Sequence, residues 1–229
     1  MPRLLLFDID GTLLDTAGAG GASLLDAVEE VLGVSRHTLP PLDLAGATDG
    51  GVFRGLFTQA GHEMQPLLVQ RYLDCYLRRL EERLGHDSFA GKTLPGILSL
   101  LPALAQSGRA DLGLLTGNVR AGADIKLKRF DLHAFFLDGA FGDDAEDRNH
   151  LGPVAVQRVS SATGRQYLPE EIVVIGDTPK DIACARAIGA RCLAVGTGVF
   201  KADALAQHSP WQCLESLADT GHVHDLLLS

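Results

Sequence analysis

Near the N-terminus the chain reads Leu4-Leu5-Leu6-Phe7-Asp8-Ile9-Asp10-Gly11-Thr12, four apolar residues followed by two acids one residue apart. A short apolar run that stops on polar residues predicts a buried strand. Side chains two apart in a strand share a face, so Asp8 and Asp10 are expected on the same side unless the loop turns them. Two carboxylates this close repel each other, which raises the pKa of one of them unless a cation lies between them. The stretch therefore predicts a metal site, a carboxyl group that stays protonated, or both.

Composition limits the classes of protein to consider. A length of 229 residues fits one large domain, or one domain with an insertion, and 46% hydrophobic residues suffice for a packed core. The net charge of −9 argues against nucleic acid or an anionic membrane as the main partner. An anionic small molecule would therefore have to be held by local donors or by a metal ion.

Cysteine usage and the first residues bear on location. Cys75, Cys184, Cys192 and Cys213 lack metal-type or redox-type spacing, and the N-terminus carries no pattern typical of a targeting segment. We expect free thiols and a cytoplasmic protein, as a monomer or a homodimer.

A block near the N-terminus has helical periodicity only. Residues 24–32, 52–60 and 67–84 are predicted helices, and no strand pattern is evident from residue 16 to residue 90. The Gly-rich run at 17–22 lacks the Gly-Lys-Ser/Thr ending of a phosphate loop, so it is predicted to be a hinge or loop leading into a helix. Residues 16–91 are thus predicted to form an all-helical unit.

Short apolar strands alternate with helices in the rest of the chain. The predicted strands are 111–115, 135–141, 172–175 and 191–195, and the predicted helices are 95–106, 120–130, 152–163 and 180–188. This alternation is typical of a parallel sheet covered by helices on both faces. We therefore predict an α/β core of residues 1–15 and 92–229, with residues 16–91 inserted after the first strand as a helical cap.

Polar residues follow three of these strands. They are Asp8 with Asp10, Thr116-Gly117-Asn118, and Asp177 with Asp181. Ligands of open parallel sheets bind at the carboxyl ends of the strands, and carboxylates that converge there favour Mg²⁺. Two alternatives stay open, namely that Asp177 is a helix N-cap and that Thr116 begins an ordinary turn.

Together the three segments resemble signatures of the haloacid dehalogenase superfamily. Asp8-Ile9-Asp10-Gly11-Thr12, Leu115-Thr116-Gly117-Asn118 and Gly176-Asp177-Thr178-Pro179-Lys180-Asp181 are similar to its first, second and fourth motifs, in that order. The layout resembles the subclass with an inserted helical cap, typified by phosphoglycolate phosphatase and β-phosphoglucomutase. The resemblance implies a Rossmann-like parallel sheet and spans essentially the whole chain.

The resemblance also implies roles for single residues. Asp8 would attack phosphorus and carry an aspartyl-phosphate, while Asp10 would act as general acid and base and offer its backbone carbonyl to the metal. Asp177 would ligate Mg²⁺, and Asp181 would support it directly or through water. Thr116, Gly117 and Asn118 would hold the phosphoryl oxygens.

The function implied by the resemblance is Mg²⁺-dependent hydrolysis of small, phosphoglycolate-like phosphomonoesters. A phosphomutase and a non-enzymatic phospho-acceptor protein are the alternatives. Asp10 argues against a haloalkanoate dehalogenase, because a halide leaving group needs no proton. The expected partner is a small phosphorylated metabolite.

One motif departs from the family pattern. The third motif usually supplies a lysine, but the matching stretch Asp147-Arg148-Asn149-His150-Leu151-Gly152-Pro153 contains none. We favour Arg148 as the substitute because a guanidinium is permanently charged and can bind phosphate in bidentate fashion. His150, Lys126 and Lys128 are the other candidates.

Substrate specificity is expected to come from the cap. Thr48 and Asp49, with Arg54 nearby, resemble the segment of capped phosphatases that faces the active site. The alternative is an ordinary loop followed by a surface arginine on a helix.

Overall fold

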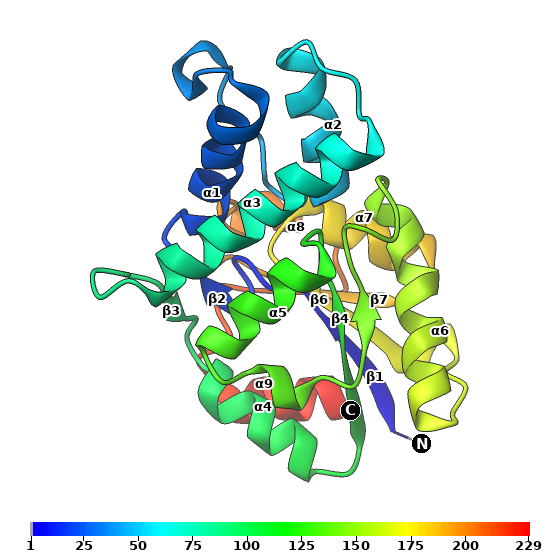
Figure 1. Ribbon diagram of the computed structural model, residues 1–229. Helices are drawn as coiled ribbons and strands as arrows, with labels where there is room; N and C mark the ends of the chain where they lie inside the picture. Colours follow the sequence, from blue (N-terminus) through cyan, green and yellow to red (C-terminus); the bar gives the residue numbers. More distant parts are fainter. Residues whose placement is uncertain (1) are drawn as a thin grey trace.

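A six-stranded parallel sheet forms the centre of the molecule (Figure 1). The computed structural model describes residues 2–229, and the strand order is β5-β4-β1-β6-β7-β8. These strands are β1 (Arg3–Phe7), β4 (Ala110–Leu115), β5 (Gly139–Ala140), β6 (Ile172–Gly176), β7 (Arg191–Val195) and β8 (Gln212–Leu214). The predicted α/β fold is confirmed, and β1 pairs with β4 on one side and with β6 on the other.

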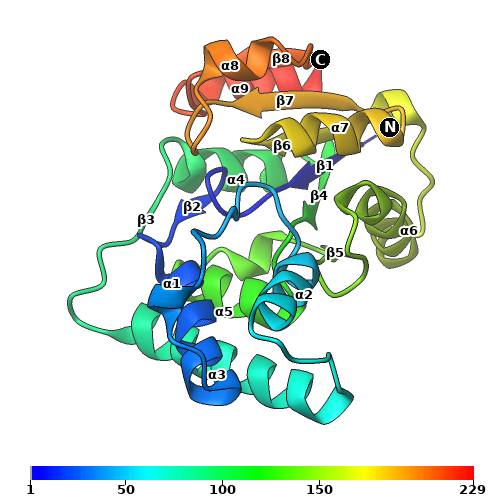
Figure 2. The same cartoon turned by 90° about the horizontal axis from the view of Figure 1, so that it is seen from above.

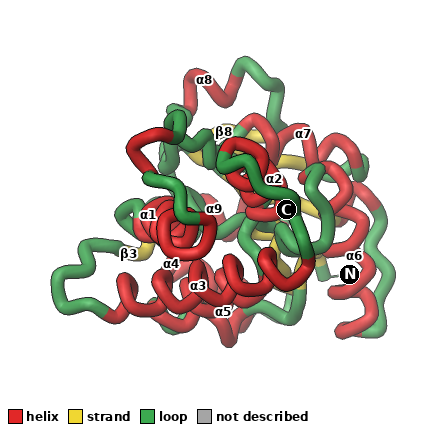
Figure 3. Tube along the Cα trace, turned by 45° about the horizontal axis from the view of Figure 1, so that its top comes forward, coloured by secondary structure: helices red, strands yellow, loops and turns green. Residues whose placement is uncertain are grey.

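Helices cover both faces of the sheet, which explains why β1 is apolar from Leu4 to Phe7. Leu5 and Phe7 face a cluster with α4 (Ile97–Gln106), α5 (Arg120–Arg129) and α9 (Thr220–Leu228). Leu4 and Leu6 face the opposite way, toward α6 (Leu151–Thr163), α7 (Pro179–Ala187) and α8 (Ala202–Ala206). In Figure 3 the strands, in yellow, accordingly lie among helices in red.

Three further helices form a unit with its own apolar cluster, which we call the cap. Its helices are α1 (Ala19–Ala27), continued by a π-helical turn at Val28–Leu32, α2 (Asp49–Gln59) and α3 (Pro66–Gly85). Phe53, Phe57, Tyr72 and Tyr76 are buried at the centre of this cluster, with their rings edge to face. The cap division at residues 16 and 91 remains a prediction.

Two short strands mark where the chain passes between core and cap. β2 (Leu14–Asp15) and β3 (Lys92–Thr93) pair antiparallel, and Figure 2 shows them between the sheet and α1. Short 3₁₀ turns complete the secondary structure at Arg36–Thr38, His133–Phe135, Arg148–His150 and Pro169–Glu171. Among residues 2–229, every helix is too short or too polar to cross a membrane.

Two predictions about local structure need correction. The strand predicted at 135–141 is only two residues long, because β5 is an edge strand that pairs solely with Leu114 and Leu115. Phe135 is the last residue of a 3₁₀ turn and Phe136 follows it, and both side chains pack on the core. The Gly-rich run at 17–22 is not all loop, since α1 begins at Ala19. The strands β2, β3 and β8 and the helices α8 and α9 were not anticipated.

The cap rests directly on the core through the segment that leads into α2. The Asp49 backbone N–H donates to the carbonyl of Gly117 at 2.6 Å, and the Asp49 carboxylate accepts from the Val119 N–H at 2.9 Å. The Thr48 hydroxyl donates to the Glu146 carbonyl at 2.6 Å. These bonds tie the start of α2 to the loop after β4 and to the segment after β5.

Replacing Gly117 by alanine tests this contact. A Cβ at Gly117 would lie 1.9 Å from the carbonyl oxygen of Ala47, so the backbone of the cap must move away. We expect Gly117→Ala to lower the free energy of unfolding by roughly 1–3 kcal/mol. We also expect faster hydrogen exchange at the amides of Asp49 and Val119. Urea unfolding and hydrogen-exchange mass spectrometry measure the two effects.

Gly55→Ala is the matched control. Gly55 lies in α2, and a Cβ there would have no heavy atom within 4 Å. A helical glycine replaced by alanine should gain about 0.5–1 kcal/mol and leave the exchange at Asp49 unchanged. Equal behaviour of the two variants would contradict the proposed contact.

Candidate active site

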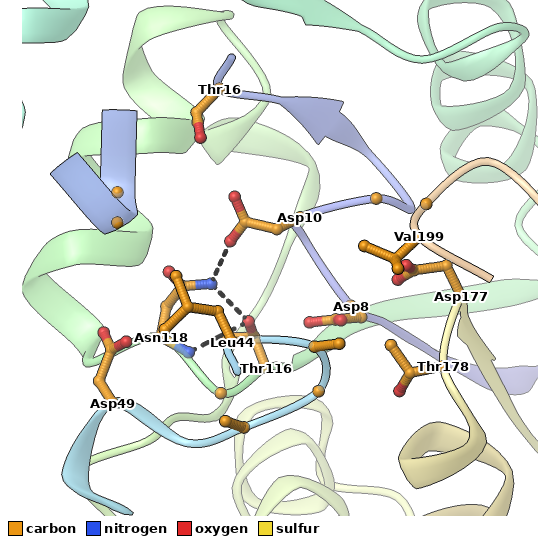
Figure 4. A pocket seen from close by; sticks show the side chains of 18 of the residues that line it. Asp8, Asp10, Thr16, Leu44, Asp49, Thr116, Asn118, Asp177, Thr178 and Val199 are labelled. Atoms are coloured by element: carbon orange, nitrogen blue, oxygen red, sulfur yellow. Dashed lines mark hydrogen bonds between the residues drawn. The ribbon is translucent and has the colours of Figure 1, made fainter. Parts of the chain in front are cut away.

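The site lies where β1, β4 and β6 end side by side. Asp8 follows β1, Thr116 follows β4 and Asp177 follows β6, so neighbouring parallel strands deliver all three to one edge of the sheet. The Asp8 N–H donates to the carbonyl of Ile175 at 2.9 Å, which fixes Asp8 against β6. Figure 4 shows Asp8 and Asp177 on neighbouring segments of this edge.

Three buried carboxylates meet there. Asp8, Asp177 and Asp181 each offer an oxygen, and these oxygens lie within 4.8 Å of one another. Burial raises the pKa of Asp8 to about 6, although Arg148 opposes the shift. Burial, helped by the charges of Asp8 and Asp181, raises the pKa of Asp177 to about 8. Without a bound cation the cluster therefore has unfavourable excess negative charge.

Asp177 is surrounded closely by small residues. The Thr12 hydroxyl donates to one of its carboxylate oxygens at 3.2 Å. A Cβ at Gly11 would lie 2.3 Å from the Asp177 carboxylate, and one at Gly198 would lie 1.7 Å from it. These two glycines allow the loops after β1 and β7 to approach the carboxylate from both sides.

The alternative that Asp177 caps α7 does not describe the structure. Thr178 is the N-cap, and its hydroxyl accepts from the Asp181 N–H at 3.3 Å. Asp181 completes a capping box, because one of its oxygens accepts from the Thr178 N–H and hydroxyl at 3.0 and 2.7 Å. Pro179 occupies the first turn of α7, where its missing N–H costs nothing.

Arg148 is the cation within the carboxylate cluster. It is 5% exposed, and its Nη2 lies 3.2 Å from Asp8, 2.5 Å from Asp181 and 3.1 Å from the Leu115 carbonyl. The two carboxylates hold the pKa of Arg148 above its ordinary value, despite the opposing effect of burial. Nη1 makes no hydrogen bond within residues 2–229 and would lie 3.2 Å from a Cβ at Gly117.

The other three candidate cations lie outside the cluster of Asp8, Asp177 and Asp181, although Lys126 lines the same cavity. Lys126 is buried, and its Nζ donates to Asp10 and to Asn118, at 2.6 Å in each case. His150 and Lys128 are exposed, and neither lines the cavity at the strand ends. Of the four, only Arg148 contacts Asp8.

The loop after β4 is held by its own side chains. The Asn118 amide donates to the Thr116 hydroxyl and to Asp10 Oδ2, at 2.8 Å in each case (Figure 4). Thr116 is fully buried, and Gly117 passes between Ala47 of the cap and Arg148. Thr116, Gly117 and Asn118 all line the cavity.

The three cap residues predicted to give specificity do not behave alike. Asp49 lines the cavity, and burial raises the pKa of its carboxyl group to about 6, opposed by Lys126. Thr48 and Arg54 do not line it, and both bind Glu146 instead. The exposed Arg54–Glu146 ion pair corresponds to the surface alternative.

A cavity of about 460 Å³ opens between the carboxylates and the cap. Several of its lining residues were missed by sequence reasoning, among them Leu24, Leu44, Tyr76 and residues 197–199. In that loop the Thr197 hydroxyl donates to the Gly11 carbonyl at 2.6 Å. Gly18, Gly20 and Gly21 line it too. The Gly-rich run was the one signal available, because glycines often mark a close approach of the backbone to another group.

Comparison with known proteins places this site in a family. The sequence profile described as haloacid dehalogenase-like hydrolase matches residues 5–195. Phosphoglycolate phosphatase 1 of Pseudomonas aeruginosa is 23% identical over 232 residues, covering 96% of this chain and 78% of its own sequence. The phosphoglycolate phosphatase of Rhodospirillum rubrum is 29% identical over 215 residues, covering 86% and 81%.

Solved structures give the same fold. A hydrolase from Pseudomonas syringae superposes with a TM-score of 0.73 at 20% identity, over 99% of this chain and 100% of that one. A haloacid dehalogenase-like family protein from Streptococcus pneumoniae has a TM-score of 0.65 at 21% identity, over 97% and 98%. The chain is a hydrolase and belongs to the haloacid dehalogenase-like hydrolase family.

Proposed function

We propose that this protein is a Mg²⁺-dependent phosphatase that hydrolyses small phosphomonoesters through an aspartyl-phosphate on Asp8. The observation that carries the proposal is the pairing of Asp8 with Arg148 at 3.2 Å beside two further buried carboxylates. A carboxylate held next to a permanent cation can accept a phosphoryl group that is itself anionic.

Asp10 completes the chemistry. An oxygen of Asp8 forms a bond to phosphorus while the bond to the leaving oxygen breaks, and that oxygen takes a proton from Asp10. Asp10 then removes a proton from water as the water oxygen attacks phosphorus and the bond to Asp8 breaks. The sum is ester plus water giving alcohol plus phosphate, with both acids regenerated. General acid–base help of this kind is typically worth ~10²–10⁴-fold in rate.

The residues present fit a magnesium ion. Their donors are all oxygens, and three buried carboxylates share only one guanidinium. Asp8, Asp177 and the Asp10 carbonyl would hold the ion, with Asp181 acting through water because both of its oxygens already accept hydrogen bonds. When bound, Mg²⁺ supplies positive charge that neutralises the acids and polarises the phosphoryl group.

Thr116, Gly117 and Asn118 would hold the phosphoryl oxygens, together with Arg148. Nη2 of Arg148 contacts Asp8, Asp181 and the Leu115 carbonyl, while Nη1 lies beside Gly117 without a hydrogen bond to any residue from 2 to 229. This division suits Nη1 as a donor to a phosphoryl oxygen. Arg148 would thereby take the place of the lysine that the third motif usually supplies.

We infer a phosphoglycolate-like substrate from the names of the relatives and from the size of the cavity, about 460 Å³. We also propose a cytoplasmic monomer or homodimer that acts on a small metabolite and not on nucleic acid or a membrane surface. The four cysteines, all free thiols, support a reducing compartment.

Asp8→Asn tests the nucleophile. An amide cannot form the acyl-phosphate under these conditions, so phosphate release from 2-phosphoglycolate should fall by at least ~10³-fold. Malachite-green detection of phosphate across a panel of small esters measures it. The control Asp124→Asn changes an exposed carboxylate on α5 and should keep wild-type rates.

Two outcomes would go against the phosphatase. Undiminished turnover by Asp8→Asn would remove Asp8 from the reaction. Isomerised sugar phosphate without net phosphate release would identify a phosphomutase, and a long-lived phosphorylated Asp8 without turnover would identify a phospho-acceptor protein.

Asp177→Asn tests the metal site through stability. The pKa of Asp177 is raised to about 8 in the folded protein, above the ~4 of an unfolded chain. The folded protein therefore holds the proton of Asp177 more tightly than the unfolded chain does. This contribution to the free energy of unfolding is fully present below pH ~4 and is lost as the pH rises to ~8. In EDTA at pH 8.5, Asp177→Asn should unfold at a higher temperature than wild type, by about 2–4 °C per kcal/mol of relieved repulsion.

With magnesium in place of EDTA, the wild type should unfold at a higher temperature than Asp177→Asn. Mg²⁺ should raise the melting temperature of the wild type more at pH 8.5 than at pH 6, because binding must displace a proton at the lower pH. Asp177→Asn should lose this increment, whereas the exposed control Asp203→Asn should retain it. An equal Mg²⁺ effect on all three proteins would argue against Asp177 as a ligand.

A further inference from the structure

Lys126 is a buried lysine that the chemistry described so far does not use. It lies on α5 and is 4% exposed. Its Nζ donates to Asp10 Oδ2 and to Asn118 Oδ1, at 2.6 Å in each case. It makes no contact with Asp8 or Asp177 among the ion pairs and hydrogen bonds of residues 2–229.

The two oxygens of Asp10 are in different situations. Oδ2 accepts from Lys126 at 2.6 Å and from the Asn118 amide at 2.8 Å. Oδ1 takes part in no hydrogen bond within residues 2–229, and the Asp10 side chain is 42% exposed. Figure 4 shows one Asp10 oxygen bonded to Asn118 and the other pointing away from it. One oxygen is thus fixed and the other is free to meet a substrate.

We propose that Lys126 is a positioning residue that holds Oδ2 of Asp10, so that Oδ1 is the oxygen that exchanges a proton with the leaving group. The inference rests on the proposed phosphatase function. In the first step the Oδ1–H bond breaks and an O–H bond forms on the leaving oxygen, which keeps the electron pair of the broken P–O bond. In the second step Oδ1 recovers a proton from the attacking water.

The hydrogen bonds around Lys126 join Asp10 to the loop after β4. Asn118 accepts from Lys126 and donates both to Asp10 and to the Thr116 hydroxyl. The carboxylate that serves the leaving oxygen and the hydroxyl that faces the phosphoryl group are therefore set relative to each other. A misplaced carboxylate loses much of its effect, because proton transfer needs the donor within hydrogen-bond distance.

The cap completes this arrangement. A Cβ at Gly20 would lie 3.5 Å from Lys126 Nζ, so the start of α1 covers the ammonium group. Burial of the lysine end strengthens its attraction for Asp10, since charges interact more strongly where water is excluded. The acid is therefore held in its working orientation while the cap lies on the core.

The leaving group offers a way to separate this role from others. p-Nitrophenolate leaves readily without a proton, whereas the alkoxide of 2-phosphoglycolate does not. Lys126→Met should lower kcat/KM for 2-phosphoglycolate by about 10²-fold or more, the usual worth of a general acid, and should lower kcat/KM for p-nitrophenyl phosphate by less than about 10-fold. The comparison uses kcat/KM because this quantity excludes the later hydrolysis of the aspartyl-phosphate, a step that both substrates share. Lys126→Gln, which keeps a donor, should recover part of the loss.

The ratio of the two kcat/KM values does not depend on how much of a preparation is folded, because both substrates are assayed on the same sample. Lys128→Met is the control, since Lys128 is exposed two residues further along α5 and does not line the cavity. It should keep both rates of the wild type.

Three results would overturn the inference. Equal losses of kcat/KM for both substrates would mean that Lys126 stabilises the fold or helps to bind the phosphoryl group. A rise in KM confined to 2-phosphoglycolate, with kcat unchanged, would mean that Lys126 binds the substrate carboxylate. Wild-type rates on both would mean that it has no role. Failure of the phosphatase proposal is distinct, because the wild type itself would then turn over neither substrate.

Discussion

The arrangement of the site depends on one imbalance of charge. Asp8, Asp177 and Asp181 are buried together, and Arg148 is the guanidinium that lies among them. Burying several carboxylates is expensive unless cations compensate them. The apolar clusters on both faces of the parallel sheet stabilise the fold against this cost. They also fix the neighbouring strands, and so the positions at which the acids follow them. The fold thus holds three acids and one guanidinium together in a place where positive charge is in deficit.

The cap takes part in the site as well as covering it. Asp49 supplies a carboxylate to the Val119 N–H at the start of α5, and Asp143 of the core accepts from the next N–H, that of Arg120, at 3.2 Å. The same residue holds the carbonyl of Gly117 through its backbone. Gly20 lies over Lys126 on that helix. The cap therefore contacts the core in two places. Asp49 holds the loop after β4, and Gly20 covers the lysine that binds Asp10.

Sequence reasoning reached the parts of this site that the ends of the strands determine. Asp8 and Asp177 follow apolar strands whose ends must meet in a parallel sheet, so their proximity could be predicted. The contact between Lys126 and Asp10 could not, since it joins residues 116 positions apart and depends on the angle of α5 to the sheet. Thr178, and not Asp177, caps α7, a choice of one position that propensity does not resolve. Edge strands as short as β5 have too few residues for a pattern.

The presence of arginine at position 148 follows from what the position must contact. A single terminal nitrogen meets Asp8, Asp181 and the Leu115 carbonyl, and the second terminal nitrogen remains beside Gly117. A lysine carries its donors on one nitrogen, whereas the guanidinium presents two terminal nitrogens in a fixed planar fork. Because the guanidinium keeps its charge at any relevant pH, Asp8 has a cation beside it in every protonation state of the three acids. The planar side chain therefore links the carboxylate cluster to the loop after β4, which a point charge would do less rigidly.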